Sequence, residues 1–98
     1  MKILLDIDGT LLINGKLHPR ANDLFEQHEI ILYSSDIQWG KYYAKKYNVP
    51  FIHKDTNVVL EADVLIDDYA FLMKNDHNLK VKKFYESIND FFDDKELM

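Results

Sequence analysis

The sequence predicts an α/β fold, and three observations along its 98 residues support this prediction. Five short apolar runs recur, stretches with a helical pattern separate them, and two of the runs are apolar at every position. Strands that alternate with helices join into a mostly parallel sheet through right-handed crossovers, with helices on both faces. We therefore expect a single domain over residues 1–98, a three-layer, Rossmann-like arrangement around an open five-stranded sheet.

Each apolar run is expected to form one strand. In order, the runs span residues 3–5, 30–33, 49–52, 64–66 and 79–84. The first and fourth runs are apolar throughout, which is typical of central parallel strands that are buried on both faces. The last run mixes apolar residues with lysines in alternation, so we expect it to form an edge strand.

Helices are expected between the strands and after the last one. The helical pattern covers residues 21–28, 37–47, 70–76 and 86–95, with a short helical turn near 56–61. Gly9, Gly15, Pro19 and Pro50 fall at predicted turns or strand edges, as their backbone preferences favour. Gly40 is the exception, because it lies in the first turn of a predicted helix, where it costs up to about 1 kcal/mol relative to Ala.

The composition excludes several kinds of protein. The absence of cysteine excludes disulfides and cysteine-ligated metals, so a chain this short must be stabilised by packing. The net charge of -5 argues against non-specific nucleic-acid binding, and the acidic residues near the end are expected to form a solvated helix face. No apolar run approaches the roughly 18 residues of a membrane span, so we expect a cytoplasmic protein with no membrane partner. The acidic residues near the end are Asp90, Asp93, Asp94 and Glu96.

Polar residues follow the first four predicted strands. They are Asp6 and Asp8; Ser34, Ser35 and Asp36; His53 and Lys54; and Asp67 and Asp68. In an open α/β sheet, ligands bind beyond the carboxyl ends of the strands, so these side chains are expected to meet at one edge. Four carboxylates placed together repel one another unless a cation lies among them. An all-oxygen set of ligands favours Mg²⁺ as that cation.

Asp67 and Asp68 also allow a simpler interpretation, a helix N-cap followed by an acidic residue in the first helical turn. This alternative is weaker for the two acidic pairs together, because both pairs directly follow apolar runs.

These residues also carry a family resemblance. The run from Asp6 to Leu11, Asp-Ile-Asp-Gly-Thr-Leu, resembles the first signature of the haloacid-dehalogenase superfamily, and Ile31 to Ser34 is similar to the second. Lys54 can serve as the third, and Val64 to Asp68 resembles the acidic fourth, so all four occur in the order of the family. The resemblance implies the core fold of that superfamily. Only residues 11–29 and 36–53 separate the first three signatures, which leaves no room for a cap domain.

The resemblance also implies a reaction, the hydrolysis of a phosphate monoester. Asp6 would be the nucleophile that forms an aspartyl-phosphate, and Asp8 the general acid and then the general base. Mg²⁺ would be held by Asp6, by the backbone carbonyl of Asp8, and by Asp67 or Asp68, and the sequence leaves the choice between these last two open.

Other positions would bind phosphate or support the loop. Ser34, Ser35 and Lys54 would hold the oxygens of the transferred group. Gly9 would allow the tight turn after the nucleophile, and Thr10 would brace the loop by a hydrogen bond to backbone. In the deoxyribonucleotidases of the superfamily, whose sequence resembles Val58 to Asp68, the corresponding lysine aligns near Asn57.

The substrate stays open at this stage. A site without a cap favours a bulky substrate, such as a phosphoprotein or a nucleic-acid end, or closure of the site by a second copy of the chain. A nucleotide or another phosphorylated metabolite is also open as the substrate. Trp39, Tyr43 and Tyr47, at helical spacing, would form such a contact, stack on a base, or belong to the core. The alternatives are a binding module without catalysis and a polynucleotide-end phosphatase. A phosphoacceptor receiver domain fits less well, because its arrangement of acidic residues is not found here.

Overall fold

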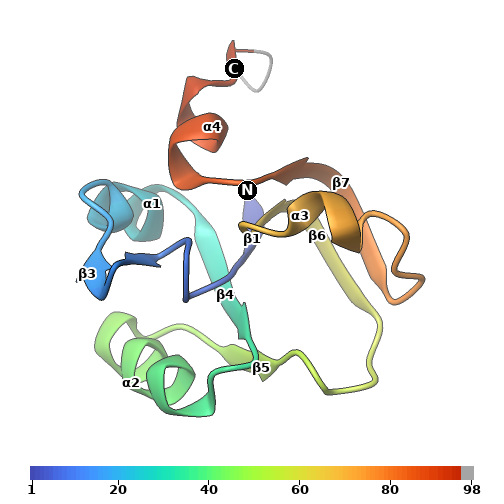
Figure 1. The fold of residues 1–98 in the computed structure, drawn as a ribbon, viewed down its shortest axis with the longest axis horizontal. Coiled ribbons are helices and arrows are strands. Elements are labelled where there is room, and N and C mark those ends of the chain that lie inside the picture. The colour runs from blue at the N-terminus through green and yellow to red at the C-terminus, as the bar shows by residue number, and fades with distance from the viewer. Residues whose placement is uncertain (96–98) are drawn as a thin grey trace.

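The computed structural model describes residues 1–95 and has a five-stranded parallel sheet with helices (Figure 1). The prediction of an α/β fold with a five-stranded parallel sheet is therefore confirmed, whereas Glu96 of the acidic tail lies outside the described residues. The strand order is β5-β4-β1-β6-β7. These strands are β1 (Lys2–Leu5), β4 (Glu29–Ser34), β5 (Phe51–His53), β6 (Leu60–Ile66) and β7 (Leu79–Tyr85).

Strand β1 lies at the centre of the sheet and fixes the register of both halves. Ile3 pairs with Ile30 of β4 on one side and with Val64 of β6 on the other. Both pairings are parallel, as are those of β5 and β7, so the carboxyl ends of all five strands lie at one edge. The prediction that residues 79–84 form an edge strand is confirmed by the place of β7.

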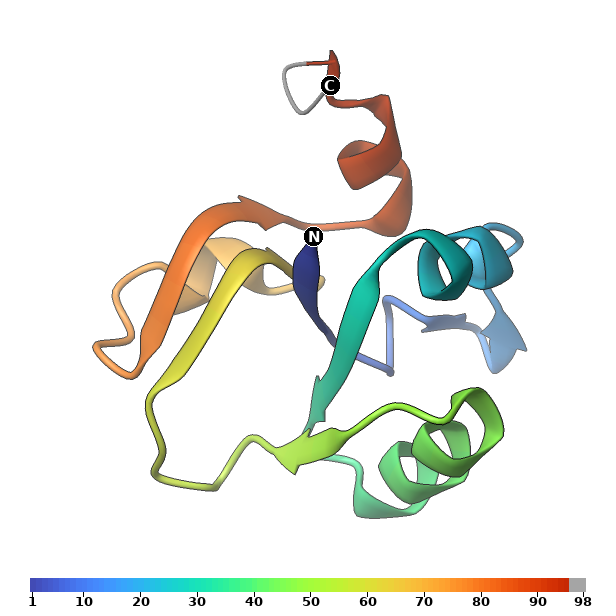
Figure 2. The same cartoon turned by 180° about the vertical axis from the view of Figure 1, so that it is seen from behind.

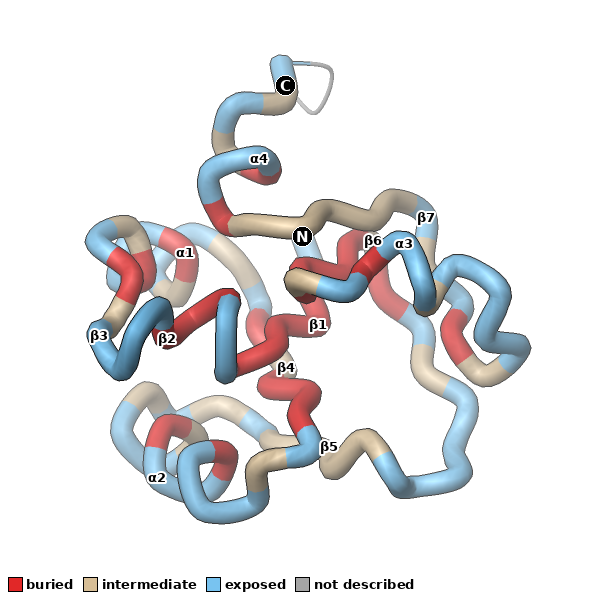
Figure 3. The backbone as a smooth tube through the Cα atoms, in the orientation of Figure 1, coloured by how far each residue is buried: buried red, intermediate tan, exposed pale blue. Residues whose placement is uncertain are grey.

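The two faces of the sheet are covered unequally. Alternate side chains of a strand point to opposite faces, and Ile3 and Leu5 pack in one cluster while Leu4 packs in another. The first cluster receives side chains from α1 (Ala21–Gln27), α2 (Ile37–Tyr47) and α4 (Ile88–Asp93). On the second face the helical contribution comes from Met73 of the short helix α3 (Ala70–Met73). Buried backbone is concentrated along β1 and the loop after it (Figure 3).

A small hairpin, which is not among the elements expected from the apolar runs, follows the loop after β1. It consists of β2 (Leu12–Ile13) and β3 (Lys16–Leu17), joined by Asn14 and Gly15. Both turn residues have positive φ, 53° and 76°. Asn-Gly is a favoured pair for this kind of turn, so the dipeptide was a usable signal for the hairpin.

The expectation of a helical turn near residues 56–61 is wrong. Leu60 and Glu61 belong to β6, where they pair with Leu79 and Lys80 of β7. The amino half of β6 extends past β1, and within residues 1–95 it pairs there with the long edge strand β7 alone. The connection from β5 to β6 is consequently an open loop, which is clear from behind in Figure 2.

The other helix boundaries are close to those expected. α3 ends at Met73 because a turn follows, in which Asp76 donates to the Met73 carbonyl and its side chain accepts from Asn78. α4 begins later than expected because the Ser87 hydroxyl caps it, accepting from the amide of Asp90. Within residues 1–95 no helix is long and apolar enough to cross a membrane.

The glycine at position 40, in the first turn of α2, is explained by packing. A Cβ added at this position would overlap the ring of Phe51 on β5, so the glycine lets α2 approach the sheet closely. In an exposed helix, Gly to Ala stabilises by up to about 1 kcal/mol. Here we expect Gly40→Ala to lower the free energy of unfolding by about 1 to 3 kcal/mol, because the core is overpacked. Urea unfolding would measure this, with exposed Gln38→Ala as control, and a stabilised Gly40→Ala protein would contradict it.

Candidate functional site

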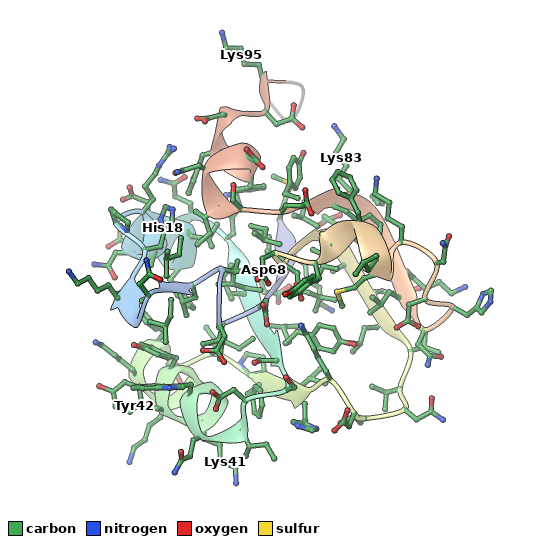
Figure 4. The ribbon with its side chains drawn as sticks, viewed as in Figure 1. His18, Lys41, Tyr42, Asp68, Lys83 and Lys95 are labelled. Atoms are coloured by element: carbon green, nitrogen blue, oxygen red, sulfur yellow. The ribbon has the colours of Figure 1, made fainter. Side chains whose placement is uncertain are left out.

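Four of the strand ends bring the predicted residues to one edge of the sheet. Asp6 follows β1, Ser34 ends β4, Lys54 follows β5, and Asp67 and Asp68 follow β6. The amide of Asp6 donates to Ile66 at 3.0 Å, and the amide of Lys54 donates to Ser34 at 3.0 Å, so the ladders continue into the site. Figure 4 shows Asp68 at the centre of the molecule, in front of the sheet.

Asp6 is a buried carboxylate, with 6% of its surface exposed. Burial, together with the negative charge of Asp67, raises its pKa from 3.8 to about 7, although Lys54 and the amide of Ile7 act in the opposite direction. A buried acid with a raised pKa signals negative charge that its surroundings do not fully neutralise. Such groups are concentrated at functional sites.

Lys54 lies between the two buried acids. Its Nζ is 2.6 Å from Oδ2 of Asp67 and 3.2 Å from Oδ1 of Asp6. Burial alone would lower the pKa of Lys54, but the hydrogen bond to Asp67 and the charges of both aspartates raise it. The ammonium group therefore stays charged at this edge of the sheet.

The alternative position for the lysine, near Asn57, is away from this cluster. The Asn57 side chain accepts a hydrogen bond of 3.1 Å from Nδ2 of Asn78, in the turn before β7. Of the two positions, the structure brings Lys54 to the aspartates.

Asp67 and Asp68 are held by different contacts. Asp67 is fully buried, and its Oδ1 accepts from the amide of Tyr69 at 2.9 Å, so it also caps the turn that leads into α3. The amide of Asp68 donates to Oγ1 of Thr10 at 3.0 Å. Thr10 thus hydrogen-bonds to backbone as expected, but it ties the loop after β1 to the loop after β6. Gly9 has a φ of 82°, and a Cβ there would overlap the Asp68 carboxylate.

Asp8 lies at the exposed rim of the site. Its pKa is raised, first by burial and then by a hydrogen bond with Asp36 and by the charges of Asp36 and Asp68. Asp36 in turn caps α2 by accepting from the amide of Trp39 at 3.0 Å. This cap was predictable from the sequence, because an aspartate directly before a predicted helix is an N-cap signal.

Ser34 and Ser35 differ in their surroundings. Ser34 is buried, and its Oγ accepts from the amide of Asp36 at 3.0 Å, which leaves the hydroxyl hydrogen to be donated elsewhere. Ser35 is exposed, and its carbonyl accepts from Nε2 of His53 at 3.1 Å. The Nδ1 atom of the same ring accepts from the amide of Asp55, so His53 joins the loops after β4 and β5.

Tyr33 was also missed as a contact of the site. The Nζ of Lys54 lies 5.7 Å from the centroid of its ring, which is within the range of a cation–π contact. Tyr33, just before Ser34 at the end of β4, carried no sequence signal for this contact, because the contact depends on the side chain of Lys54, which follows the neighbouring strand β5.

The donor set fits a hard divalent cation. One carboxylate oxygen from each of Asp6, Asp67 and Asp68 lies within 4.8 Å of the others. The three carboxylates carry more negative charge than one ammonium group balances, and that group contacts only Asp6 and Asp67 among them. Mg²⁺ prefers oxygen ligands of this kind. The carboxylate of Asp8 is not part of this cluster.

These pKa shifts predict a pH-dependent stability. Between about pH 4 and pH 7 the folded chain keeps a proton on Asp6 that the unfolded chain has lost, so stability falls as the pH rises through this window. The loss is at most about 4 kcal/mol, and Mg²⁺ at 100 times its Kd would restore about 2.7 kcal/mol at pH 8. Urea unfolding at pH 5 and pH 8, with EDTA or Mg²⁺, measures both effects. An equal stability at both pH values without Mg²⁺ would contradict the assignment.

A hollow of about 660 Å³ lies at the amino ends of β6 and β7, and its lining includes Lys2, Asp63 and Lys82. Asp6, Lys54, Asp67 and Asp68 do not line it. Comparison of the chain with protein-family models, with curated proteins and with solved structures gives no significant match.

Proposed function

We propose that the chain is a Mg²⁺-dependent phosphate monoester hydrolase of the haloacid-dehalogenase type, in which Asp6 receives the phosphoryl group. The observation that carries the proposal is the meeting of Asp6, Lys54 and Asp67 at the carboxyl edge of a parallel sheet. One oxygen of each aspartate lies within 3.2 Å of the Lys54 ammonium group. The parallel sheet and the order of the residues along the chain support the same proposal. The site would act on a phosphorylated small molecule or a macromolecular phosphoester.

In the first step a carboxylate oxygen of Asp6 attacks phosphorus, and the bond between phosphorus and the leaving oxygen breaks. Lys54 and the hydroxyl of Ser34 hold the transferring oxygens, by charge and by hydrogen bonding. Asp8 gives its proton to the leaving oxygen, and its raised pKa is what this role requires.

In the second step water attacks the aspartyl-phosphate and releases inorganic phosphate, which restores Asp6. Asp8, which lost its proton in the first step, now accepts one from the water. Its exposed position at the rim allows contact with both the leaving group and the solvent.

Mg²⁺ would be held by Asp6, by the backbone carbonyl of Asp8, and by either Asp67 or Asp68. When bound, the ion would neutralise the charge between the carboxylate nucleophile and the anionic phosphate. The raised pKa of Asp6 is consistent with this need for a cation.

The proposal is tested with the purified protein and a panel of phosphate esters that starts with p-nitrophenyl phosphate. Hydrolysis is expected with Mg²⁺, and it should stop when EDTA is added. Saturable binding of Mg²⁺ without hydrolysis of any ester would contradict the phosphatase and favour a binding module that retains the fold. Hydrolysis that persists in EDTA would contradict the metal requirement.

A further inference from the structure

The net charge of the chain hides a segregation of charge around α2. Residues 37–54 contain four lysines and no acidic residue, and all 17 acidic residues lie outside this segment. Three of the lysines, Lys41, Lys45 and Lys46, are exposed on α2. The fourth is Lys54 of the candidate site. An acidic molecule therefore carries one basic helix, and this helix starts at the proposed phosphate site.

The same helix exposes aromatic rings. Trp39 is 43% exposed and Tyr42 is 53% exposed, and their ring centroids lie 5.6 Å apart. Behind them Trp39 stacks on Tyr43, and Tyr43 on Tyr47, which fixes the orientation of the exposed rings. Figure 4 shows Lys41 and Tyr42 on the outer side of α2. We call Trp39, Lys41, Tyr42, Lys45 and Lys46 the α2 strip.

The α2 strip begins at the rim of the site. Asp36, which caps α2 through the amide of Trp39, also contacts Asp8. From this cap the helix leads away over 11 residues, a length of about 16 Å. A ligand whose terminal phosphate reaches Asp6 can therefore continue along the lysines and rings of α2.

We propose that the α2 strip binds single-stranded nucleic acid and presents its terminal phosphate to Asp6. This inference rests on the proposed function and names its substrate class, a polynucleotide end. Lysines neutralise the phosphates of the strand, and exposed rings stack on unpaired bases in a manner that tolerates any sequence.

The lysines of the α2 strip favour a polyanion as the partner, and they exclude the acidic surface of a second copy of this chain less strongly. The exposed rings decide which kind of polyanion fits. An acidic phosphopeptide would pair with the lysines but would leave Trp39 and Tyr42 without planar partners. Every base of a single strand offers such a plane. The strip therefore fits nucleic acid better than an acidic peptide.

Binding is tested by fluorescence anisotropy with a short fluorescein-labelled oligothymidylate that carries a terminal phosphate. The protein is the Asp6→Asn variant, so that the phosphate stays in place. Adding Lys41→Gln, Lys45→Gln and Lys46→Gln should weaken binding at least about ten-fold at low salt and reduce the salt slope by about 2. Adding Tyr42→Ala instead should weaken binding about five-fold or more, because a stacking plane is lost.

Matched controls lie on the other side of the molecule. Lys74→Gln, Lys80→Gln and Lys82→Gln change the net charge by the same amount at three exposed lysines of the α3–β7 region. Phe71→Ala removes a ring that is 57% exposed on α3. Both controls should leave the affinity within about two-fold of the Asp6→Asn parent. Equal losses in the α2 and control triples would overturn the proposal, since only bulk charge would then matter.

Hydrolysis of p-nitrophenyl phosphate separates this inference from the proposed function. In the otherwise unchanged protein, the α2 triple should keep its turnover of this small ester and lose its preference for the phosphorylated oligonucleotide. Turnover of the ester with no oligonucleotide binding would overturn the inference alone. Oligonucleotide binding that depends on α2, without any turnover, would support the α2 strip and contradict the phosphatase. Loss of phosphopeptide binding in the triple, with oligonucleotide binding unchanged, would overturn the inference in favour of a protein partner.

Discussion

Replacing Asp6 with asparagine is expected to abolish phosphate-ester turnover, with kcat reduced at least about a thousand-fold. An amide is a poor nucleophile toward phosphorus, and no other side chain of the cluster occupies the end of β1. The folded state should not suffer, because the substitution removes a charge that burial and Asp67 both disfavour. Steady-state kinetics with p-nitrophenyl phosphate and urea unfolding at pH 8 measure the two expectations.

Asp23→Asn provides a matched control for that experiment. Asp23 is exposed in the first turn of α1, so the same chemical change occurs outside the cluster of Asp6, Asp67 and Asp68. Its kcat should remain within about two-fold of the parent. If the Asp6→Asn protein turns over the ester as fast as the parent, Asp6 is not the nucleophile. If that variant unfolds, the charge of Asp6 is not unfavourable in the folded state.

Replacing Lys54 with methionine is expected to cause the largest loss of stability, about 3 kcal/mol at pH 8 without Mg²⁺. The substitution keeps most of the side-chain volume but leaves two buried carboxylates without the ammonium group that contacts both. Protonation of Asp6 relieves the repulsion, so the loss should shrink at pH 5. Added Mg²⁺ should also restore part of the stability at pH 8, since a cation can replace the missing charge.

Lys82→Met is the control for the loss of an ion pair. The side chain of Lys82 is 82% exposed, and its Nζ lies 3.6 Å from Oδ1 of Asp63. A surface pair of this kind contributes at most about 1 kcal/mol. If both lysine variants lose the same stability in chemical denaturation, the ion pairs of Lys54 are no more important than those at the surface.

The periodicity of the sequence was sufficient for the parallel sheet but not for the segment before β6. Apolar runs at 3–5 and 64–66 predicted β1 and β6, which pair with each other inside the sheet. Strands that are buried on both faces need apolar residues at every position. Leu60 and Glu61 could not be assigned in this way. Their extended conformation depends on pairing with Leu79 and Lys80, which lie 19 residues further along the chain. The Asn14-Gly15 turn, by contrast, had a local signal.

The candidate site was predictable where residues directly follow strands, because the edge of a parallel sheet collects them. Asp6, Lys54 and Asp67 meet for this reason. The roles of Asp36 and Tyr33 depend on side-chain geometry. Asp36 contacts Asp8, and the ring of Tyr33 lies under the ammonium group of Lys54. Ser35, although adjacent to Ser34, is exposed, and its carbonyl is held by His53. Neighbours at a strand end point in opposite directions, and the sequence alone does not give the side that each one takes.

The crossover from β5 to β6 also governs when the site comes into existence during folding. β1, β4 and β5 complete one half of the sheet from residues 2–53, but one edge of β1 stays unpaired until β6 is inserted beside it. Asp67 arrives with that insertion, so the two buried carboxylates are forced together in the same event that closes the centre of the sheet. Formation of non-local parallel pairs is slow. Any ion that binds both carboxylates therefore stabilises the completed sheet and not the fragment of residues 2–53.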